Sequence, residues 1–129
     1  LGKKLYLKVE HLIAHNKIPK VALDTKAKEV IIEISDKMLG TTAVMNNNKV
    51  VGIITDGDIR RMLTKFNDIN LISAQDIMSK NPKTIEKNAL VTKAFELMEK
   101  HIISQLIVTD NGEYVGVIHI HDLIKEGIF

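Results

Sequence analysis

The sequence predicts a mixed α/β fold of the α+β kind, in which two pseudo-symmetric β-α-β-β-α repeats pack through their sheets. Short runs of β-branched residues alternate with segments whose apolar residues follow the spacing of a helix face. The run that begins at Val51 returns at Val115, and the match continues from Val21 to Gly127, always 64 residues on. One unit of about 45 residues buries too little apolar surface to be stable alone, so the two copies are expected to pack together.

Composition excludes several classes of protein. The 129 residues carry a net charge of +2, and the aromatic residues are 2 Tyr and 3 Phe, too few for base stacking, so no nucleic-acid partner is expected. The apolar runs are too short to span a membrane, and no signal peptide is visible. The chain has no Cys, which suits a cytoplasmic location. It does not begin with Met, so we expect a piece of a longer protein.

The first repeat is expected to begin near the break at Pro19. A short strand holds Val21 and Leu23, Asp24 caps the next helix, and Gly40 ends that helix. The apolar stripe of this helix consists of Ala27, Val30, Ile31, Ile34 and Met38. Strands over 42–45 and 49–55 then form a hairpin around the asparagines at 46–48, and a short helix covers 58–65.

The second repeat is expected to copy these elements. Asn88 caps its helix, whose stripe consists of Val91, Ala94, Phe95, Met98 and Ile102. Strands over 105–109 and 113–119 flank a turn at 110–112, and a helix over 121–126 closes the repeat. The predicted organisation is a connector and N-terminal arm (1–17), repeat 1 (18–65), a linker with a helical turn (66–81) and repeat 2 (82–129).

Polar residues gather where the last strand of each repeat meets its closing helix. Thr55 and Asp58 lie at the first junction, followed by Arg60 and Arg61. The second junction carries His119, His121 and Asp122. A helix start offers free N–H groups and a positive dipole end, so it is a natural place to hold a phosphate.

These junctions resemble the signature of the CBS domain pair, also called the Bateman module. The signature is a Gly, two apolar residues, a Thr or Ser, two variable residues and an Asp. Residues 52–58 match it fully, and residues 116–122 match except that His119 replaces the hydroxyl residue. Segments 55–61, 81–85 and 119–123 further resemble the C-terminal CBS pair of the arabinose-5-phosphate isomerase family, and residues 1–5 resemble the connector from the sugar-isomerase domain of that family.

The resemblance implies which residues bind a ligand. In CBS pairs the motif Asp commonly holds ribose hydroxyls, while the Thr and the helix-start amides meet phosphate. Carried over by position, and with the cations and the start of the second repeat added, the expected ligand-binding residues are Thr55, Asp58, Arg60, Arg61, Lys83, Thr84, His119, His121 and Asp122. The alternative is that Asp56, Asp58 and Asp122 only cap helices.

The two histidines raise the question of a metal. Alternate residues of a strand share a face, so His119 and His121 are spaced for a shared metal ion. A zinc site would need a third ligand such as Asp122. We expect no metal and no cofactor, and a ligand or turn contact for one of the histidines.

The predicted function is therefore regulatory. The resemblance implies a module of an arabinose-5-phosphate isomerase, in Kdo, lipopolysaccharide or capsule biosynthesis, that binds a nucleotide-type metabolite such as CMP-Kdo in the cleft between the repeats. It also implies a homodimer or higher homo-oligomer, attached to an N-terminal sugar-isomerase domain. The alternatives are a sensor of AMP or ATP, or an oligomerisation module with no ligand. The fragment itself shows no catalytic residue set, so we expect no enzyme activity from it.

Overall fold

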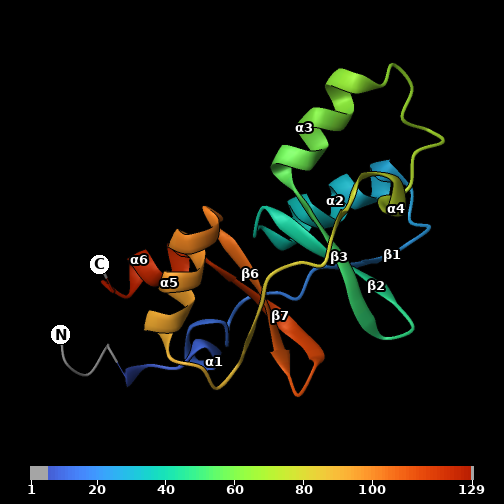
Figure 1. The fold of residues 1–129 in the computed structure, drawn as a ribbon. Coiled ribbons are helices and arrows are strands. Elements are labelled where there is room, and N and C mark those ends of the chain that lie inside the picture. Colours follow the sequence, from blue (N-terminus) through green and yellow to red (C-terminus); the bar gives the residue numbers. More distant parts are fainter. Residues whose placement is uncertain (1–5, 129) are drawn as a thin grey trace. The chain divides into compact units, whose positions relative to one another are not determined.

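The computed structural model describes residues 6–128 and divides them into two compact units. One unit runs from Lys17 to Pro82, and the other joins the residues up to Asn16 to those from Lys83 onward. The connector predicted at residues 1–5 lies outside the described residues. Mixed helices and strands, in two sheets, confirm the predicted fold class (Figure 1).

The unit of the first repeat is built on a sheet of order β1-β2-β3-β4. Its elements are β1 (Lys20–Ala22), α2 (Ala27–Lys37), β2 (Thr41–Asn46), β3 (Lys49–Thr55), α3 (Asp56–Lys65), α4 (Ala74–Ile77) and β4 (Ser79–Lys80). β1 pairs parallel to β2, and the other neighbours are antiparallel. Asn47 and Asn48 both have positive φ, as a two-residue hairpin turn requires.

The unit of the second repeat has a sheet of order β5-β6-β7. Its elements are α1 (Val9–Leu12), β5 (Thr84–Glu86), α5 (Val91–His101), β6 (Gln105–Asp110), β7 (Glu113–His119) and α6 (Ile120–Lys125). α6 packs beside α5 (Figure 1). The register of the second sheet repeats that of the first 64 residues on: Thr42 opposes Ile54, and Leu106 opposes Ile118.

Each unit has its own apolar core. In the first repeat, Val30 and Ile34 of α2 pack with Val44 and Ile54 of the sheet. In the second repeat the buried cluster consists of Val9, Ile85, Val91, Ala94, Met98, Leu106, Val108, Ile118 and Leu123. The predicted apolar stripes face the core along the helices but are wrong at their last residues, Met38 and Ile102. Both residues follow the last helical residue in left-handed conformation, and they are 81% and 91% exposed.

The predicted helix caps are wrong. α2 begins after Lys26 and α5 after Leu90, so Asp24 and Asn88 lie in the preceding turns. The chain leaves α2 through Met38, and Gly40 follows with positive φ in the bend before β2.

The N-terminal arm precedes the first repeat but packs in the unit of the second. The linker precedes the second repeat but packs in the unit of the first. α1 of the arm belongs to the unit of the second repeat, where the N–H of Val9 donates to the carbonyl of Ala89. α4 of the linker belongs to the unit of the first repeat, where the N–H of Ala74 donates to the carbonyl of Thr25. Each folding unit is thus a repeat completed by the segment that precedes the other repeat.

No helix between residues 6 and 128 combines the length and the apolar character that crossing a membrane would take.

Candidate functional site

The first strand-to-helix junction is a closed capping box. Thr55 is extended and precedes α3, and its hydroxyl accepts the N–H of Asp58 at 3.3 Å. In return, Asp58 Oδ2 accepts the backbone N–H of Thr55 at 2.9 Å and its hydroxyl at 3.2 Å. These bonds satisfy donors that a helix start otherwise leaves open. The two residues predicted to meet a ligand therefore bond each other.

The arginines after this box take different places. Arg61 donates from Nη2 to Asp58 Oδ1 at 2.6 Å, and the Asp58 side chain is 9% exposed against 72% for Arg61. Arg60 is exposed. The guanidinium of Arg61 has five N–H donors, so its exposed part can bind an anionic ligand while the bond to the buried Asp58 carboxylate is kept.

The second junction has the same box with an imidazole in place of the hydroxyl. His119 Nδ1 accepts the N–H of His121 at 3.0 Å, and Asp122 Oδ2 accepts the N–H of His119 at 2.8 Å. His119 therefore caps α6 as a Thr or Ser of the signature would. The rings of His119 and His121 lie 4.4 Å apart, tilted by 43°.

Asp58 and Asp122 both cap helices, and this role leaves ligand binding by the same carboxylates a prediction. Asp56 takes no part in the box, and its N–H donates to the carbonyl of Gly40. Within residues 6–128, no group of three or more His, Cys, Asp or Glu side chains is arranged to hold a metal ion.

Lys83 and Thr84 belong to the same unit as the second junction. The carbonyl of Lys83 accepts the N–H of Ile107, and Thr84 pairs with Ile107. Because Gln105 begins β6 opposite His119, both residues lie toward the end of the sheet at which α6 starts. The structure thus brings Lys83, Thr84, His119, His121 and Asp122 to one end of one sheet, while Thr55, Asp58, Arg60 and Arg61 belong to the other unit.

Sequence reasoning missed residues at both junctions. Asn16 donates from Nδ2 to Asp122 Oδ2 at 3.2 Å and to the carbonyl of Val117 at 3.4 Å. In the first repeat, Thr41 is fully buried and opposes Thr55, and its hydroxyl donates to the carbonyl of Ile54. A signal for Asn16 exists in the arm, because aligning residues 8–13 with 73–78 places Asn16 opposite Asn81.

Two hollows occur in the unit of the first repeat. One, of about 500 Å³, lies beside β1 and α2, with Lys20 and Glu33 in its wall. The other, of about 450 Å³, lies between Met38 and the start of α3, with Asp56 in its wall. Thr55 and Asp58 line neither of these two hollows.

Relatives match nearly the whole length of this chain. Arabinose 5-phosphate isomerase KdsD of Francisella tularensis is 46% identical over 129 residues, covering 97% of this chain and 39% of the relative. The protein of the same name in Escherichia coli K12 is 32% identical over 130 residues, covering 99% of this chain and 40% of the relative. The chain therefore spans about two fifths of the length of these relatives.

Solved structures share the fold. A crystal structure of a CBS domain superimposes with a TM-score of 0.85 at 22% identity, covering 95% of this chain and 98% of the other. A CBS domain protein from Pyrobaculum aerophilum, complexed with AMP, gives a TM-score of 0.81 at 26% identity, covering 91% and 90%.

The family comparison agrees with the repeat in the sequence. The CBS domain family matches twice, at residues 9–65 and 74–128. The two matches include α1 and α4, the segments that change places between the units. The chain belongs to the CBS domain family and consists of a tandem CBS pair.

Proposed function

We propose that this CBS pair is the regulatory part of an arabinose-5-phosphate isomerase and that its effector is a nucleotide-type metabolite, CMP-Kdo. The relatives named arabinose 5-phosphate isomerase support the parent activity, since this chain matches two fifths of their length at 46% and 32% identity. The AMP complex of the Pyrobaculum aerophilum neighbour supports a nucleotide as ligand class.

The observation that carries the proposal is the Asp58 carboxylate, buried to 9% exposure, with its partners. An ionised carboxylate accepts two hydrogen bonds from a vicinal diol, which a ribose supplies. Arg61 is bonded to Oδ1 and is 72% exposed, so its other N–H donors can bind a phosphate or a sugar-acid carboxylate. In the second repeat Asn16 holds the equivalent Asp122, and its amide is exchangeable for a hydroxyl.

CMP-Kdo supplies each of the groups that these residues recognise. Its ribose suits Asp58, its phosphate suits the Thr55 hydroxyl and the start of α3, and its carboxylate suits Arg61 or a histidine. A downstream product with this structure would make the module a feedback sensor.

A second candidate is an adenine-nucleotide sensor, favoured by the AMP complex of the Pyrobaculum aerophilum neighbour. It uses the same Asp58 and Thr55 contacts, so only the choice of base and of anionic group separates the two candidates. Oligomerisation without a ligand is the third outcome, and homo-oligomer formation is compatible with either sensor.

The test is calorimetric titration with CMP-Kdo, CMP, AMP and ATP. Asp58→Ala and Asp58→Asn remove the carboxylate, and the second keeps the shape of the cap. Asp24→Ala is the matched control, because Asp24 is exposed and lies in the turn before α2. The proposal expects CMP-Kdo to bind most tightly, with affinity lost about tenfold or more in both Asp58 variants, as for a charged hydrogen-bond partner.

The other outcomes separate the alternatives. Preference for AMP or ATP would replace CMP-Kdo by the adenine nucleotides. Absence of binding by all four compounds, in a folded chain, would leave oligomerisation as the function. Equal loss in Asp24→Ala would show that binding does not depend on the junction.

A further inference from the structure

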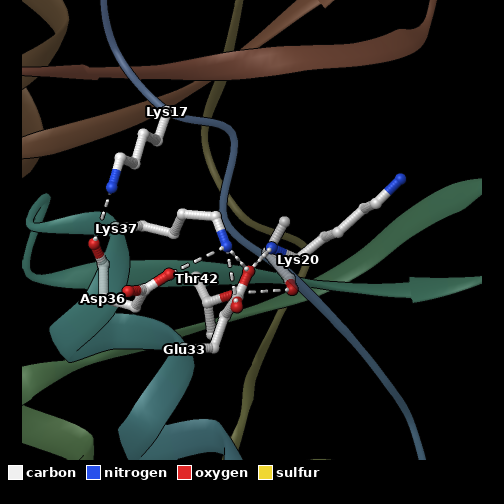
Figure 2. A network of polar contacts seen from close by, with 7 residues as sticks. Lys17, Lys20, Glu33, Asp36, Lys37 and Thr42 are labelled. Atoms are coloured by element: carbon white, nitrogen blue, oxygen red, sulfur yellow. Dashed lines mark hydrogen bonds and ion pairs between the residues drawn. The ribbon is translucent and has the colours of Figure 1, made fainter.

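In the first repeat, a carboxylate accepts a hydrogen bond from a backbone N–H at the outer edge of β1. Glu33 Oε2 accepts the backbone N–H of Lys20 at 3.0 Å, and both carboxylate oxygens accept from Lys37 Nζ, at 3.0 and 3.1 Å (Figure 2). Asp36 lies 3.6 Å from the same ammonium. The hydrogen bond that Lys37 donates to Glu33 is the main reason that the pKa of Lys37 is raised.

The second repeat keeps the same backbone and loses these acids. Sixty-four residues on, Thr84 stands for Lys20, Leu97 for Glu33 and His101 for Lys37. Leu97 packs against the apolar core. Among the neighbours, Lys83 replaces Pro19 and Lys100 replaces Asp36, while Glu96 replaces Ile32 and Glu99 replaces Ser35.

Lys83 and Lys100 each lie near His101. The pKa of His101 is lowered by desolvation first and then by the charges of Lys83 and Lys100. Within the part of the chain that the structure describes, no carboxylate forms an ion pair with any of the three. Two ammonium groups without an ion-pair partner favour an anion placed beside them, and the imidazole of His101 can donate an N–H to that anion.

An N–H group faces the same place. The carbonyl of Lys83 and the N–H of Lys87 both bond to β6, so by alternation the N–H of Thr84 points to the free edge of β5. Its counterpart at Lys20 donates to Glu33. Between residues 6 and 128, Thr84 has no carboxylate acceptor of this kind.

We propose that Lys83, Lys100 and His101, with the N–H of Thr84, form a binding site for a phosphate or carboxylate group, which occupies the place that the Glu33 carboxylate fills in the first repeat. The site rests on the proposed function only in taking this anion to be part of a nucleotide. Lysines act here as point charges and the edge amide gives direction.

The experiment is an NMR titration of the whole chain with pyrophosphate at about 150 mM salt, where distant surface charges are screened. Saturable shifts of the Thr84 amide and of the His101 ring are expected. Lys100→Ala should weaken pyrophosphate binding by about threefold or more, as for one exposed charge pair. Lys93→Ala is the matched control, because it removes an equal charge from an exposed position of the same helix.

A second variant supplies the missing carboxylate. Leu97→Glu places an acid where the first repeat has Glu33, so it should fill the site from within and abolish the Thr84 response. Leu97 contacts the core, so the result for Leu97→Glu counts only if the NMR spectrum of the variant shows a folded chain. If the variant does not fold, the Lys100→Ala titration alone tests the site.

The outcomes separate this site from the proposed function. Repeating the titration with AMP, CMP, adenosine and cytidine should show the Lys100→Ala loss for the two nucleotides and not for the two nucleosides. Unchanged pyrophosphate and nucleotide affinities in Lys100→Ala, or an equal loss in Lys93→Ala, would overturn the anion site and leave nucleotide binding at Asp58 standing. Pyrophosphate binding that needs Lys100, with no nucleotide bound, would support the anion site and refute the nucleotide sensor.

Discussion

The signature glycine of each repeat makes room for the segment that completes its unit. A Cβ atom on Gly52 would lie 2.5 Å from Met78 Sδ and 3.0 Å from the carbonyl of Ser79. On Gly116 it would lie 3.3 Å from Ile13 Cδ1. The arm and the linker therefore approach their sheets closely at the glycine, and a larger residue would push them away.

We predict that Gly52→Ala destabilises the chain by about 1–3 kcal/mol, the usual effect of overpacking. Urea unfolding monitored by circular dichroism measures this. Gly57→Ala is the control, because its Cβ would meet only the end of the Arg61 side chain and the Thr55 hydroxyl at 3.4 Å or more. A stability of Gly52→Ala equal to that of Gly57→Ala would contradict the close approach.

Glu86 makes the stability of the second repeat depend on acid pH. The hydroxyl of Thr109 donates to Glu86 Oε2, and the N–H of Asn111 donates to Oε1 at 2.9 Å. These bonds, the Thr109 bond first, hold the pKa of Glu86 below its ordinary value of 4.5. The ionised group therefore stabilises the fold above that value, and the stabilisation is lost as the pH falls through the lowered pKa.

We predict that thermal stability falls more steeply below pH 4.5 in the wild type than in Glu86→Gln. Melting temperatures from pH 7 to pH 3 measure the difference, with the exposed Glu96→Gln as a variant of equal charge change. Parallel curves for wild type and Glu86→Gln would refute the role of Glu86.

At the scale of the element, the ends of α2 and α5 carry unfavourable residues. Ile102 has φ 54° and is 91% exposed, and Met38 has φ 64°. The N–H of Ile103 donates to the carbonyl of Met98, which is the bond of a Schellman motif, where glycine is preferred. A β-branched residue in this conformation is strained and gains no packing here.

Ile102→Gly should therefore stabilise the chain by about 0.5–1 kcal/mol, since relief of the left-handed conformation exceeds the extra entropy of an unfolded glycine. Differential scanning calorimetry measures the rise in melting temperature. Ile102→Ala removes the same apolar side chain and keeps the strain, so it should not show the gain. A glycine variant that melts below both would mean that the Ile102 side chain stabilises the fold.

The strands could be predicted from the sequence more closely than the helix starts. β3 and β7 have the predicted bounds because apolar alternation and turn residues are local signals. Asp24 and Asn88 are good caps by type, yet the N–H of Ala27 donates to the carbonyl of Ile72, and that of Val91 to the carbonyl of Leu7. Distant backbone supplies these caps, and no local pattern contains that information.

The junctions show the same limit. Thr55 and Asp58 could be found from the signature, and so could their partners by position in the second repeat. Their bonds to one another follow the known spacing of a capping box. The contact of Asn16 with Asp122 could not be found in this way, because it joins the arm to the closing strand and helix of the second repeat.

At the scale of the whole molecule, the repeat in the sequence and the unit in the structure differ. The unit of the first repeat ends at Pro82, well beyond α3, because α4 and β4 complete it. Ala74 is fully buried, its N–H donates to the carbonyl of Thr25, and that of Gln75 donates to the carbonyl of Leu23. β4 covers the edge of β3 through the pairs Gly52–Lys80 and Ile53–Ser79.

A fragment cut at the structural boundaries, 17–82, should therefore fold, whereas one cut at the repeat, 18–65, should not. The shorter fragment exposes the edge of β3 and loses several buried backbone hydrogen bonds, each worth about 1 kcal/mol, from a core that is already small. Dispersion of the amide resonances and a cooperative urea transition would identify the folded fragment. If 18–65 unfolded at the same urea concentration as 17–82, α4 and β4 would add nothing to the unit, and the exchange of arm and linker between the repeats would have no energetic basis.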